Sequence, residues 1–224
     1  MHTDNQLYIP FHNTRLINSR LISPRIRKII ASGEYEYPEI RLAMEQVKTN
    51  DIVLELGAGI GALSCMIMKN TPAAKYICVE ANPALAPIIK KNHKINEIKG
   101  CEVIAGAMSN DEHRQEADFY ITEDFWASSL SRPPEFAEAK KVPVYLFNDI
   151  LKKYRPTCII CDIEGGEFEL FTPGVDFSSV KTVIMEVHNP GSIEPLKLLD
   201  SFLQSFGLLL QNPPFRPDIL LFKR

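Results

Sequence analysis

Residues 51–62 read D-I-V-L-E-L-G-A-G-I-G-A, an apolar run that ends in a glycine-rich turn. The apolar run is typical of a short buried strand, and the residues after the turn, L-S-C-M-I-M-K-N, are typical of a helix. The spacing of Gly57, Gly59 and Gly61 indicates that the backbone approaches another group closely at this point. A pyrophosphate or an adenosyl sulfonium would fit such a turn, and the two ligands imply different enzymes.

The rest of the chain alternates between predicted strands and helices. Strands are predicted at 51–56, 75–80, 101–107, 157–164 and 181–188, and helices at 61–70, 82–96 and 194–206. This alternation predicts an α/β fold with a mostly parallel sheet and helices on both faces. Two last strands are expected around the proline-rich turn at Asn212-Pro213-Pro214.

Two segments stand outside this alternation. The stretch at about 111–146 is polar and aromatic and contains several prolines, so we expect a hairpin and loop insertion that lies over one end of the sheet. Residues 1–50 are expected to form a helical N-terminal extension. Residues 51–224 are expected to form a single cofactor-binding domain.

The composition is that of an ordinary globular protein, with 224 residues, 45% of them hydrophobic and 24% charged. The net charge of −3 predicts no nucleic-acid partner, because such binding needs a strongly basic surface. We also expect no transmembrane segment and no secretory signal, since neither has the apolar run it needs. Five scattered cysteines favour a cytoplasmic protein without disulfides, and a homo-oligomer is left open.

The segment between Asp4 and Glu34 contains no acidic residue. Its basic residues are Arg15, Arg20, Arg25, Arg27 and Lys28. Apolar residues are interleaved with them, so the favoured interpretation is an amphipathic helix that packs on the domain and keeps its arginines in water. A patch for an anionic acceptor is one alternative, and a transit or membrane-surface helix is another.

Two acids lie near the glycine turn, and one of them, Glu55, distinguishes its possible ligands. Glu80 ends the next strand and could accept hydrogen bonds from a ribose diol in either cofactor. Glu55 lies two residues before Gly57, where a carboxylate would be a poor neighbour for a pyrophosphate. A carboxylate there suits a cationic methionine moiety, because it accepts from the amino group and offsets the sulfonium charge. An S-adenosylmethionine site is therefore favoured over a nicotinamide site.

Four more polar side chains are expected at the same edge of the sheet. Asp162 and Glu164 end one predicted strand, and Glu186 and His188 end the next. Carboxylates with an imidazole suit magnesium or manganese, but this spacing is not diagnostic, and we predict a site without a metal.

Several motifs between Asp51 and His188 occur in a recognisable order. They include C-V-E-A-N-P-A-L-A-P-I-I-K-K-N, V-I-A-G-A-M-S-N-D, W-A-S-S-L and V-Y-L-F-N-D-I-L, and the most specific are D-I-E-G-G-E and M-E-V-H. With the glycine turn, this succession resembles the FkbM-type methyltransferases. The resemblance implies a Rossmann-like, seven-stranded class I methyltransferase sheet with S-adenosylmethionine as cofactor. It also implies a hydroxyl acceptor on a sugar, glycan or natural product.

The resemblance also implies roles for single residues. Glu80 would bind the ribose, Ala81 and Ala107 would lie beside the adenine, and Asp162 would lie beside the methyl-transfer centre. Relatives commonly carry a lysine just before that aspartate, where this chain has Cys161. The residues implied at the methionine and ribose side of the cofactor are Glu55, Gly57, Ala58, Gly59 and Gly61.

Methyl transfer from a sulfonium mainly requires alignment of the reacting atoms in a dry pocket. A hydroxyl acceptor also gains from a base, for which Asp162 is the first candidate and His188 the second. The residues predicted to contact the acceptor are Trp126, Ser128, Ser129 and Glu164.

Two other functions compete with an O-methyltransferase. A non-catalytic binding protein would keep the cofactor fold as a platform, but Glu55, Glu80 and Asp162 are all present, which argues for a working site. A nicotinamide-dependent oxidoreductase is disfavoured by Glu55 and by the lack of a recognisable hydride-transfer set.

Overall fold

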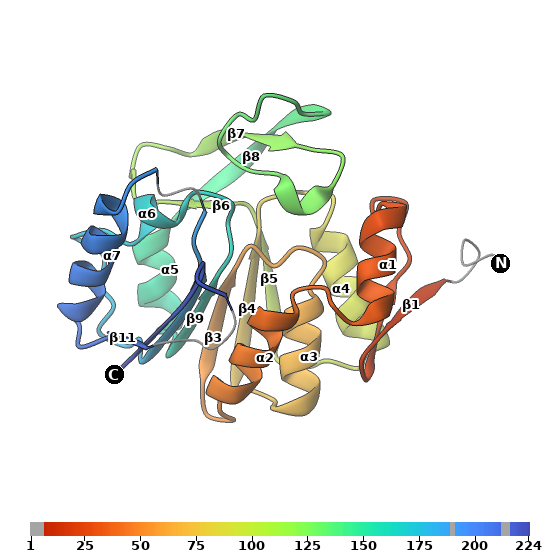
Figure 1. Cartoon of the computed structure of the whole chain (residues 1–224), viewed down its shortest axis with the longest axis horizontal. Helices are drawn as coiled ribbons and strands as arrows, with labels where there is room; N and C mark the ends of the chain where they lie inside the picture. Colours follow the sequence, from red (N-terminus) through yellow and green to blue (C-terminus); the bar gives the residue numbers. More distant parts are fainter. Residues whose placement is uncertain (1–6, 189–190, 212–215) are drawn as a thin grey trace.

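A seven-stranded sheet forms the centre of the fold (Figure 1). The computed structural model describes residues 7–188, 191–211 and 216–224, so the expected turn at Asn212-Pro213-Pro214 lies outside the described residues. In spatial order the strands are β11 (Leu209–Gln211), β12 (Ile219–Lys223), β10 (Thr182–Glu186), β9 (Cys158–Cys161), β3 (Ile52–Leu56), β4 (Lys75–Glu80) and β5 (Cys101–Ala105).

The strand order reverses in the middle of this sheet. β3 pairs in parallel with β4 on one side and with β9 on the other, although β9 comes much later in the chain. β12 is antiparallel to both of its neighbours, β10 and β11. In an open α/β sheet the ligand binds at the carboxyl ends of the strands where the order reverses, so this topology places a binding crevice at the ends of β3 and β9.

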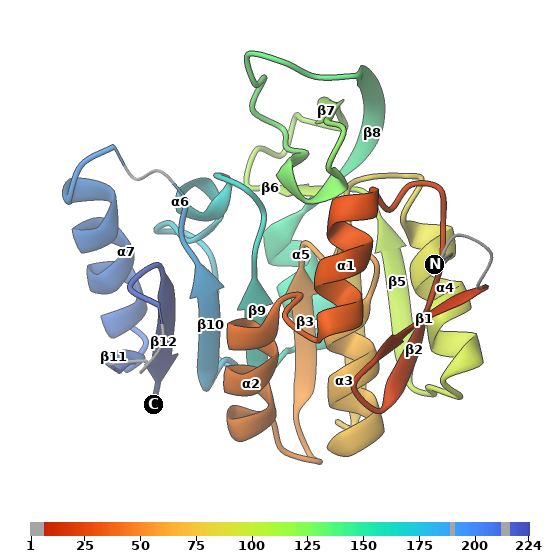
Figure 2. The same cartoon turned by 45° about the vertical axis from the view of Figure 1, so that its right-hand side comes forward.

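Helices cover both faces of the sheet, and each strand alternates between two apolar cores. In β3, Val53 packs in one core, and Leu54 and Leu56 pack in the other. One face carries α1 (Pro24–Ser32), α2 (Tyr37–Gln46), α3 (Ala62–Asn70) and α4 (Ala86–Ile95), and the other carries α5 (Phe147–Tyr154) and α7 (Glu194–Gln204) (Figure 2). Over the described ranges, no helix has the length and apolar character needed to cross a membrane.

The N-terminal extension, expected to be helical, begins instead with a β-hairpin. Its strands are β1 (Tyr8–Phe11) and β2 (Thr14–Ile17), each only four residues long. Strands this short carry little periodic signal, which is why the sequence did not reveal them. Leu16, Ile26 and Ile30 are buried in the same core as Val53, so the extension shares the core of residues 51–224.

The favoured interpretation of the basic segment holds in part. Arg15, Arg20, Arg25 and Lys28 are exposed. Of the apolar residues interleaved with them, Leu16, Ile22, Ile26 and Ile30 are buried and Leu21 is 39% exposed. Only α1 is the expected amphipathic helix, because Arg15 belongs to β2. Ser23 caps α1, because its hydroxyl accepts from the backbone N–H of Ile26 at 3.2 Å.

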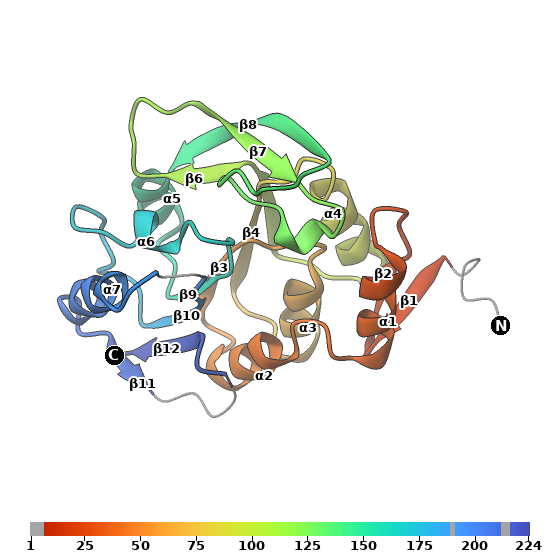
Figure 3. The ribbon, with the colours of Figure 1, turned by 45° about the horizontal axis from the view of Figure 1, so that its top comes forward.

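The expected hairpin and loop over 111–146 are present and belong to a second sheet, in which two strands pair in antiparallel and a third strand is added in parallel. This sheet contains β6 (Ala107–Ser109), β8 (Glu138–Leu146) and β7 (Glu116–Ile121), in the order β6-β8-β7, and it lies across the end of the central sheet (Figure 3). The strand expected over 101–107 divides at Gly106, whose φ is 152°. A Cβ there would lie 2.6 Å from the carbonyl oxygen of Pro143 in β8, so the approach of β8 requires a glycine.

Two buried asparagines of the α4 segment tie the hairpin to the domain. The side chain of Asn92 accepts from the backbone N–H of Ile17 at 2.7 Å and donates to the carbonyl of Ile60 at 2.8 Å. Asn96, just after α4, accepts from the backbone N–H of Arg15 at 2.9 Å and donates to the carbonyl of the same residue. Because Ile60 belongs to the glycine turn, Asn92 links the extension to that turn.

We predict that Asn92→Ala lowers the free energy of unfolding by about 2 kcal/mol or more. The substitution leaves the backbone N–H of Ile17 and the carbonyl of Ile60 without their partner in a buried place. Urea unfolding followed by circular dichroism measures the change. The matched control is Asn70→Ala, which removes an exposed side chain bonded to Asn13 and should cost less than about 1 kcal/mol. Equal losses in the two variants would show that Asn92 has no special role.

Candidate active site

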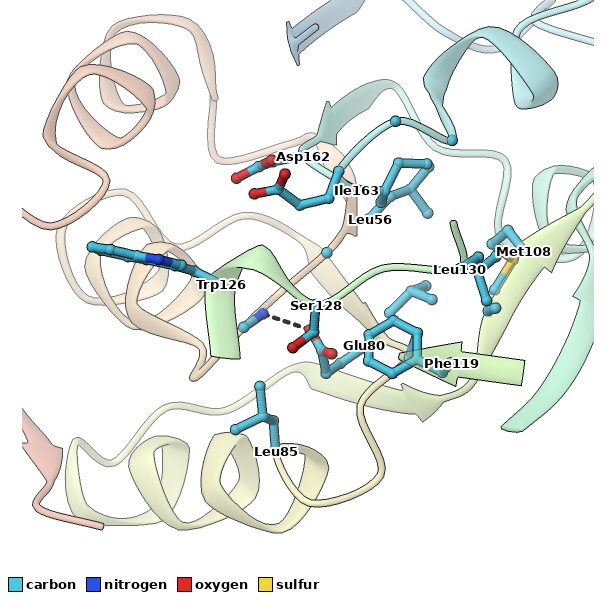
Figure 4. A pocket seen from close by; sticks show the side chains of 18 of the residues that line it. Leu56, Glu80, Leu85, Met108, Phe119, Trp126, Ser128, Leu130, Asp162 and Ile163 are labelled. Atoms are coloured by element: carbon cyan, nitrogen blue, oxygen red, sulfur yellow. Dashed lines mark hydrogen bonds between the residues drawn. The ribbon is translucent and has the colours of Figure 1, made fainter. Parts of the chain in front are cut away.

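A cavity opens where β3, β4 and β9 end, beneath the second sheet (Figure 4). Its walls come from five parts of the chain that are distant in sequence. The lining residues used below are Tyr35, Glu36, Gly57, Gly59, Glu80, Ala81, Leu85, Ala107, Met108, Arg114, Phe119, Trp126, Ser128, Leu130, Asp162 and Glu164. The cavity therefore lies at the crevice that the sheet topology predicts.

The glycine turn fits against other parts of the protein as well as facing the cavity. A Cβ on Gly57 would lie 1.7 Å from the carbonyl oxygen of Asp162, and one on Gly61 would lie 2.9 Å from Ile89. Gly59 faces the cavity, where a Cβ would lie 3.3 Å from the hydroxyl of Tyr35. All three have positive φ, which favours glycine. Of the three, Gly59 is the one placed for close contact with a ligand through its backbone.

Glu80 is the buried carboxylate beside this turn. One of its oxygens accepts from the backbone N–H of Gly59 at 2.7 Å, the bond drawn in Figure 4, and the other accepts from the backbone N–H of Asn82 at 2.7 Å. Burial raises the pKa of Glu80 to about 7, although these two hydrogen bonds act in the opposite direction. Each oxygen keeps a free lone pair, so Glu80 can still accept from two hydroxyls of a ribose.

One end of the cavity is apolar and the other is acidic. Beside Glu80, the apolar end is made by Ala81, Leu85, Ala107, Met108, Phe119 and Leu130 (Figure 4). Such a surface suits a flat heterocycle such as adenine. The opposite end is lined by Glu36, Asp162 and Glu164. The predicted residues Ala81 and Ala107 therefore lie at the apolar end, and Asp162 lies at the acidic end.

Several predicted site residues do not line this cavity. Ala58 and Gly61 face the protein, and the hydroxyl of Ser129 donates to the carbonyl of Ser131 at 2.8 Å. Glu55 is 3% exposed and lies in a small recess behind Gly57, where Cys78 donates to it. Burial raises the pKa of Glu55 to about 8. Glu55 therefore acts on a ligand, if at all, from behind the turn rather than from the cavity wall.

Residues of the N-terminal extension, which the sequence analysis did not include in the site, complete the cavity. Tyr35 stacks on Trp126 with ring centroids 6.2 Å apart and planes 4° apart. Arg25 lies 5.6 Å above the Trp126 ring and 3.6 Å from Asp124. Trp126 belongs to a 3₁₀ turn, η1 (Phe125–Ala127). The only feature of the sequence that could have indicated these residues is the run E-Y-E-Y-P-E at 34–39. Its composition does not predict the path of its backbone.

His188 joins the predicted acids into one cluster. Its Nε2 lies 3.7 Å from Asp162, 3.6 Å from Glu164 and 3.8 Å from Glu186. Its Nδ1 is bonded at 2.9 Å to Glu167, the first residue of α6 (Glu167–Leu170). The expected strand over 157–164 ends at Cys161, and a turn with Glu164 at φ 54° follows it. This turn, rather than strand alternation, brings Glu164 to His188.

The cluster holds His188 in its charged form. Burial lowers the pKa of His188, but the hydrogen bond to Glu167 and the charges of Glu164 and Asp162 outweigh this and raise it to about 9. Burial and the charge of Glu186 raise the pKa of Asp162 well above its usual range, against the effect of His188. His188 is therefore an imidazolium among carboxylates near neutral pH.

The same side chains have the spacing of a possible metal centre. Asp162, Glu164 and His188 each offer a ligand atom within 4.8 Å of the others. An imidazolium explains the cluster without an ion, and the absence of a metal stays a prediction from the sequence.

Comparison with known proteins gives partial matches. A family model described as the TRM5/TYW2 methyltransferase domain matches residues 25–124, from α1 through the glycine turn to the residue before η1. Over 55 residues the chain is 42% identical to the ribosomal RNA small subunit methyltransferase A of Chlorobaculum parvum (strain DSM 263 / NCIMB 8327). That segment is 24% of this chain and 19% of the relative, so the match spans about a fifth of the relative's length.

Solved structures share the fold at low identity. Trm5b from Pyrococcus abyssi superposes with a TM-score of 0.52 at 12% identity, covering 98% of this chain and 55% of that one. A protein of the NADB-Rossmann superfamily from Streptococcus agalactiae gives a TM-score of 0.51 at 12% identity, covering 83% of this chain and 67% of that one. The chain thus spans about half of the length of Trm5b.

These findings bear on the fold and on the cofactor. The fold is the Rossmann-like α/β fold of class I methyltransferases, as the sequence predicted. The matched family model supports an S-adenosylmethionine-dependent methyltransferase, and the predicted cofactor is confirmed. The FkbM-type family is not the one whose model matches.

The prediction that nucleic acid is excluded as a partner is wrong. The curated relative is named a ribosomal RNA methyltransferase, and Trm5 and TYW2 are RNA methyltransferases. The argument from net charge failed because it summed the whole chain. Acids such as Glu36, Asp162 and Glu186 line the cavity and its recess, whereas Arg20 and Lys28 are exposed on the N-terminal segment.

We predict that Glu80→Ala weakens S-adenosylmethionine and S-adenosylhomocysteine binding about ten- to hundredfold, because charge-assisted hydrogen bonds to the ribose are lost. Isothermal titration calorimetry with both ligands and NADH measures this. Glu116→Ala, which removes an exposed glutamate of β7, is the matched control and should leave affinity unchanged. Binding of NADH in place of the adenosyl ligands would contradict the assignment of the cavity.

Proposed function

We propose that this chain transfers the methyl group of S-adenosylmethionine to a hydroxyl of a sugar-bearing acceptor, with Asp162 at the reaction centre. The observation that carries the proposal is the position of Asp162. It lines the acidic end of the cavity, and its Oδ1 is buried without a hydrogen-bond partner among the described residues. This oxygen lies 3.7 Å from Nε2 of His188 and accepts no hydrogen bond from the described residues, so it keeps lone pairs that can accept the proton of an incoming hydroxyl.

The lining of the cavity offers a matching surface for each part of the cofactor. The apolar end would hold the adenine, Glu80 the ribose diol, and the acidic end the positively charged sulfur and amino group. When bound, S-adenosylmethionine supplies an electrophilic methyl group whose leaving group needs no protonation. The chain's own residues then have to exclude water, orient the acceptor and take up one proton.

The sequence left open whether Asp162 or His188 acts as the base. An imidazolium cannot accept a proton, and His188 is protonated near neutral pH because its neighbours raise its pKa to about 9. Asp162 therefore acts as the base, and burial and the charge of Glu186, which raise its pKa, make its carboxylate a stronger base. His188 holds Asp162 and Glu164 in place from 3.7 and 3.6 Å.

The acceptor would enter beside Trp126 and Ser128, which line the cavity. The indole of Trp126, which already contacts Tyr35 and Arg25, can offer its edge to a sugar ring. The Ser128 hydroxyl accepts from the N–H of Thr122 at 3.1 Å and lies 3.4 Å from the Thr122 hydroxyl, and its remaining lone pair can accept from a hydroxyl of the acceptor. Glu164 lines the same end. The resemblance of the D-I-E-G-G-E and M-E-V-H motifs to FkbM-type enzymes supports a hydroxyl as the methylated group.

A second candidate acceptor is RNA. The match of residues 25–124 to the TRM5/TYW2 domain favours it, as does the exposure of Arg15, Arg20, Arg25 and Lys28 on the segment next to the cavity. Exposed basic side chains bind phosphates, and a ribose also offers a hydroxyl. The two candidates share the hydroxyl chemistry and differ in what carries the sugar.

We predict that Asp162→Asn lowers the rate of methyl transfer about a hundredfold or more while S-adenosylhomocysteine binding changes less than about threefold. The rate in the unsubstituted chain should fall as the pH drops through the pKa of Asp162, because the protonated carboxyl cannot act as a base. This fall should be absent in the variant. Asp149→Asn, on the exposed face of α5, is the matched control. An unchanged rate in Asp162→Asn would refute the assigned base.

The acceptor class is decided by offering both candidates with labelled S-adenosylmethionine. One arm uses total RNA with and without nuclease digestion, and the other uses a panel of free sugars, nucleotide sugars and glycosides. If RNA is the acceptor, the paired substitution of Arg20 and Lys28 by glutamate should weaken RNA binding and reduce its dependence on salt. Label in the sugar panel alone would exclude the RNA candidate.

A further inference from the structure

The loop between α1 and α2 brings two side chains over the glycine turn. Glu36 has a left-handed backbone, with φ 49°, and Tyr35 is 3% exposed. A Cβ placed on Gly59 would lie 3.3 Å from the hydroxyl of Tyr35 and 3.7 Å from Oε1 of Glu36. The carboxylate of Glu36 therefore lies next to the backbone that borders the cofactor, although it comes from the N-terminal extension.

Glu36 lies where the main cavity meets the small acidic recess behind Gly57. Four residues line both spaces: Glu36, Leu56, Gly57 and Asp162. The recess is lined by five carboxylates, those of Glu36, Glu39, Glu55, Asp162 and Glu186. A positively charged group at the junction of the two spaces would lie between Glu36, which comes from the N-terminal extension, and Asp162, which follows β9.

The carboxylates of this recess differ in their counter-charges. Arg216 lies 2.5 Å from Glu186 and 3.8 Å from Glu39, and His188 lies 3.7 Å from Asp162. Across the described ranges, no lysine, arginine or histidine nitrogen lies within 4 Å of a carboxylate oxygen of Glu36. Burial and the nearby charge of Glu55 raise the pKa of Glu36 well above its usual range. A half-buried carboxylate without a cation gains when a ligand supplies one.

We infer that Glu36 binds the ammonium group of the methionine part of the cofactor, so that the N-terminal extension completes the cofactor seat. The inference rests on S-adenosylmethionine being the methyl donor in the proposed function. An ammonium group offers three donors, which suits a carboxylate on one side and the surrounding acids on the other. Asp162 is left for the acceptor, because the ammonium is held by Glu36.

The test compares two neutral-sulfur ligands that differ in the amino-acid part. S-adenosylhomocysteine carries the ammonium group, whereas 5′-methylthioadenosine lacks the whole amino-acid part and keeps the adenosine. We expect Glu36→Gln to weaken S-adenosylhomocysteine binding about tenfold or more and to change 5′-methylthioadenosine binding less than about twofold in calorimetry. Glu36→Asp, which keeps the charge, should retain part of the preference for S-adenosylhomocysteine.

The matched control is Glu34→Gln, an exposed glutamate of the same loop, which should leave both affinities unchanged. If Glu36→Gln weakened the binding of both ligands equally, Glu36 would have a structural role only. If it weakened the binding of neither ligand, the ammonium group would bind elsewhere. Either result overturns the inference. Thermal unfolding of each variant shows whether the chain remains folded. The proposed function fails separately, namely if the unsubstituted chain binds neither S-adenosylmethionine nor S-adenosylhomocysteine.

Discussion

The close approach of Gly57 to the carbonyl of Asp162 is the constraint on which the rest of this site depends. A Cβ at residue 57 would lie 1.7 Å from that oxygen, so β3 and β9 can end side by side only if residue 57 has no side chain. The backbone N–H of Asp162 donates to the carbonyl of Leu56 at 2.9 Å in the same place. The approach fixes the glycine turn beside Glu80 and puts the side chain of Asp162 on the opposite wall, which sets the span of the cavity.

The electrostatics of the site follow from this crowding. The strand ends and α2 bring several carboxylates into a small volume of low dielectric constant, and the folded chain compensates only part of their charge with Arg216 and His188. Uncompensated buried charges lower the stability of the free protein, because each loses its hydration. A cationic ligand recovers this loss. The same uncompensated carboxylates therefore lower the stability of the protein without ligand and raise its affinity for a cationic ligand, a trade-off that is common at preformed binding sites.

The sequence predicted the central fold well and the site unevenly. The alternating strands and helices around Gly57, and the acids at strand ends such as Glu80 and Asp162, were readable because period and spacing are local properties. Tyr35 and Glu36 were not, since their position depends on a left-handed residue and on the packing of α1. Local patterns also could not show that Glu55 lies behind the turn, because its environment is made by Cys78 and by α2. Tertiary contacts determine the positions of Tyr35 and Glu36 and the environment of Glu55.

The contact between Tyr35 and Trp126 has a consequence for the kinetics of ligand exchange. The wall of the extension and the wall of the second sheet meet through this stack and through Arg25, which lies above the same indole and near Asp124. Such aromatic and cation–π contacts contribute about 0.5–2 kcal/mol each, and an exposed ion pair contributes about 0–1 kcal/mol. Tyr35 is also 3% exposed and packs in the same apolar core as Phe125, so separating the two walls exposes core side chains. Ligand exchange through this side of the cavity is therefore coupled to a local opening of the core rather than to the rotation of single side chains.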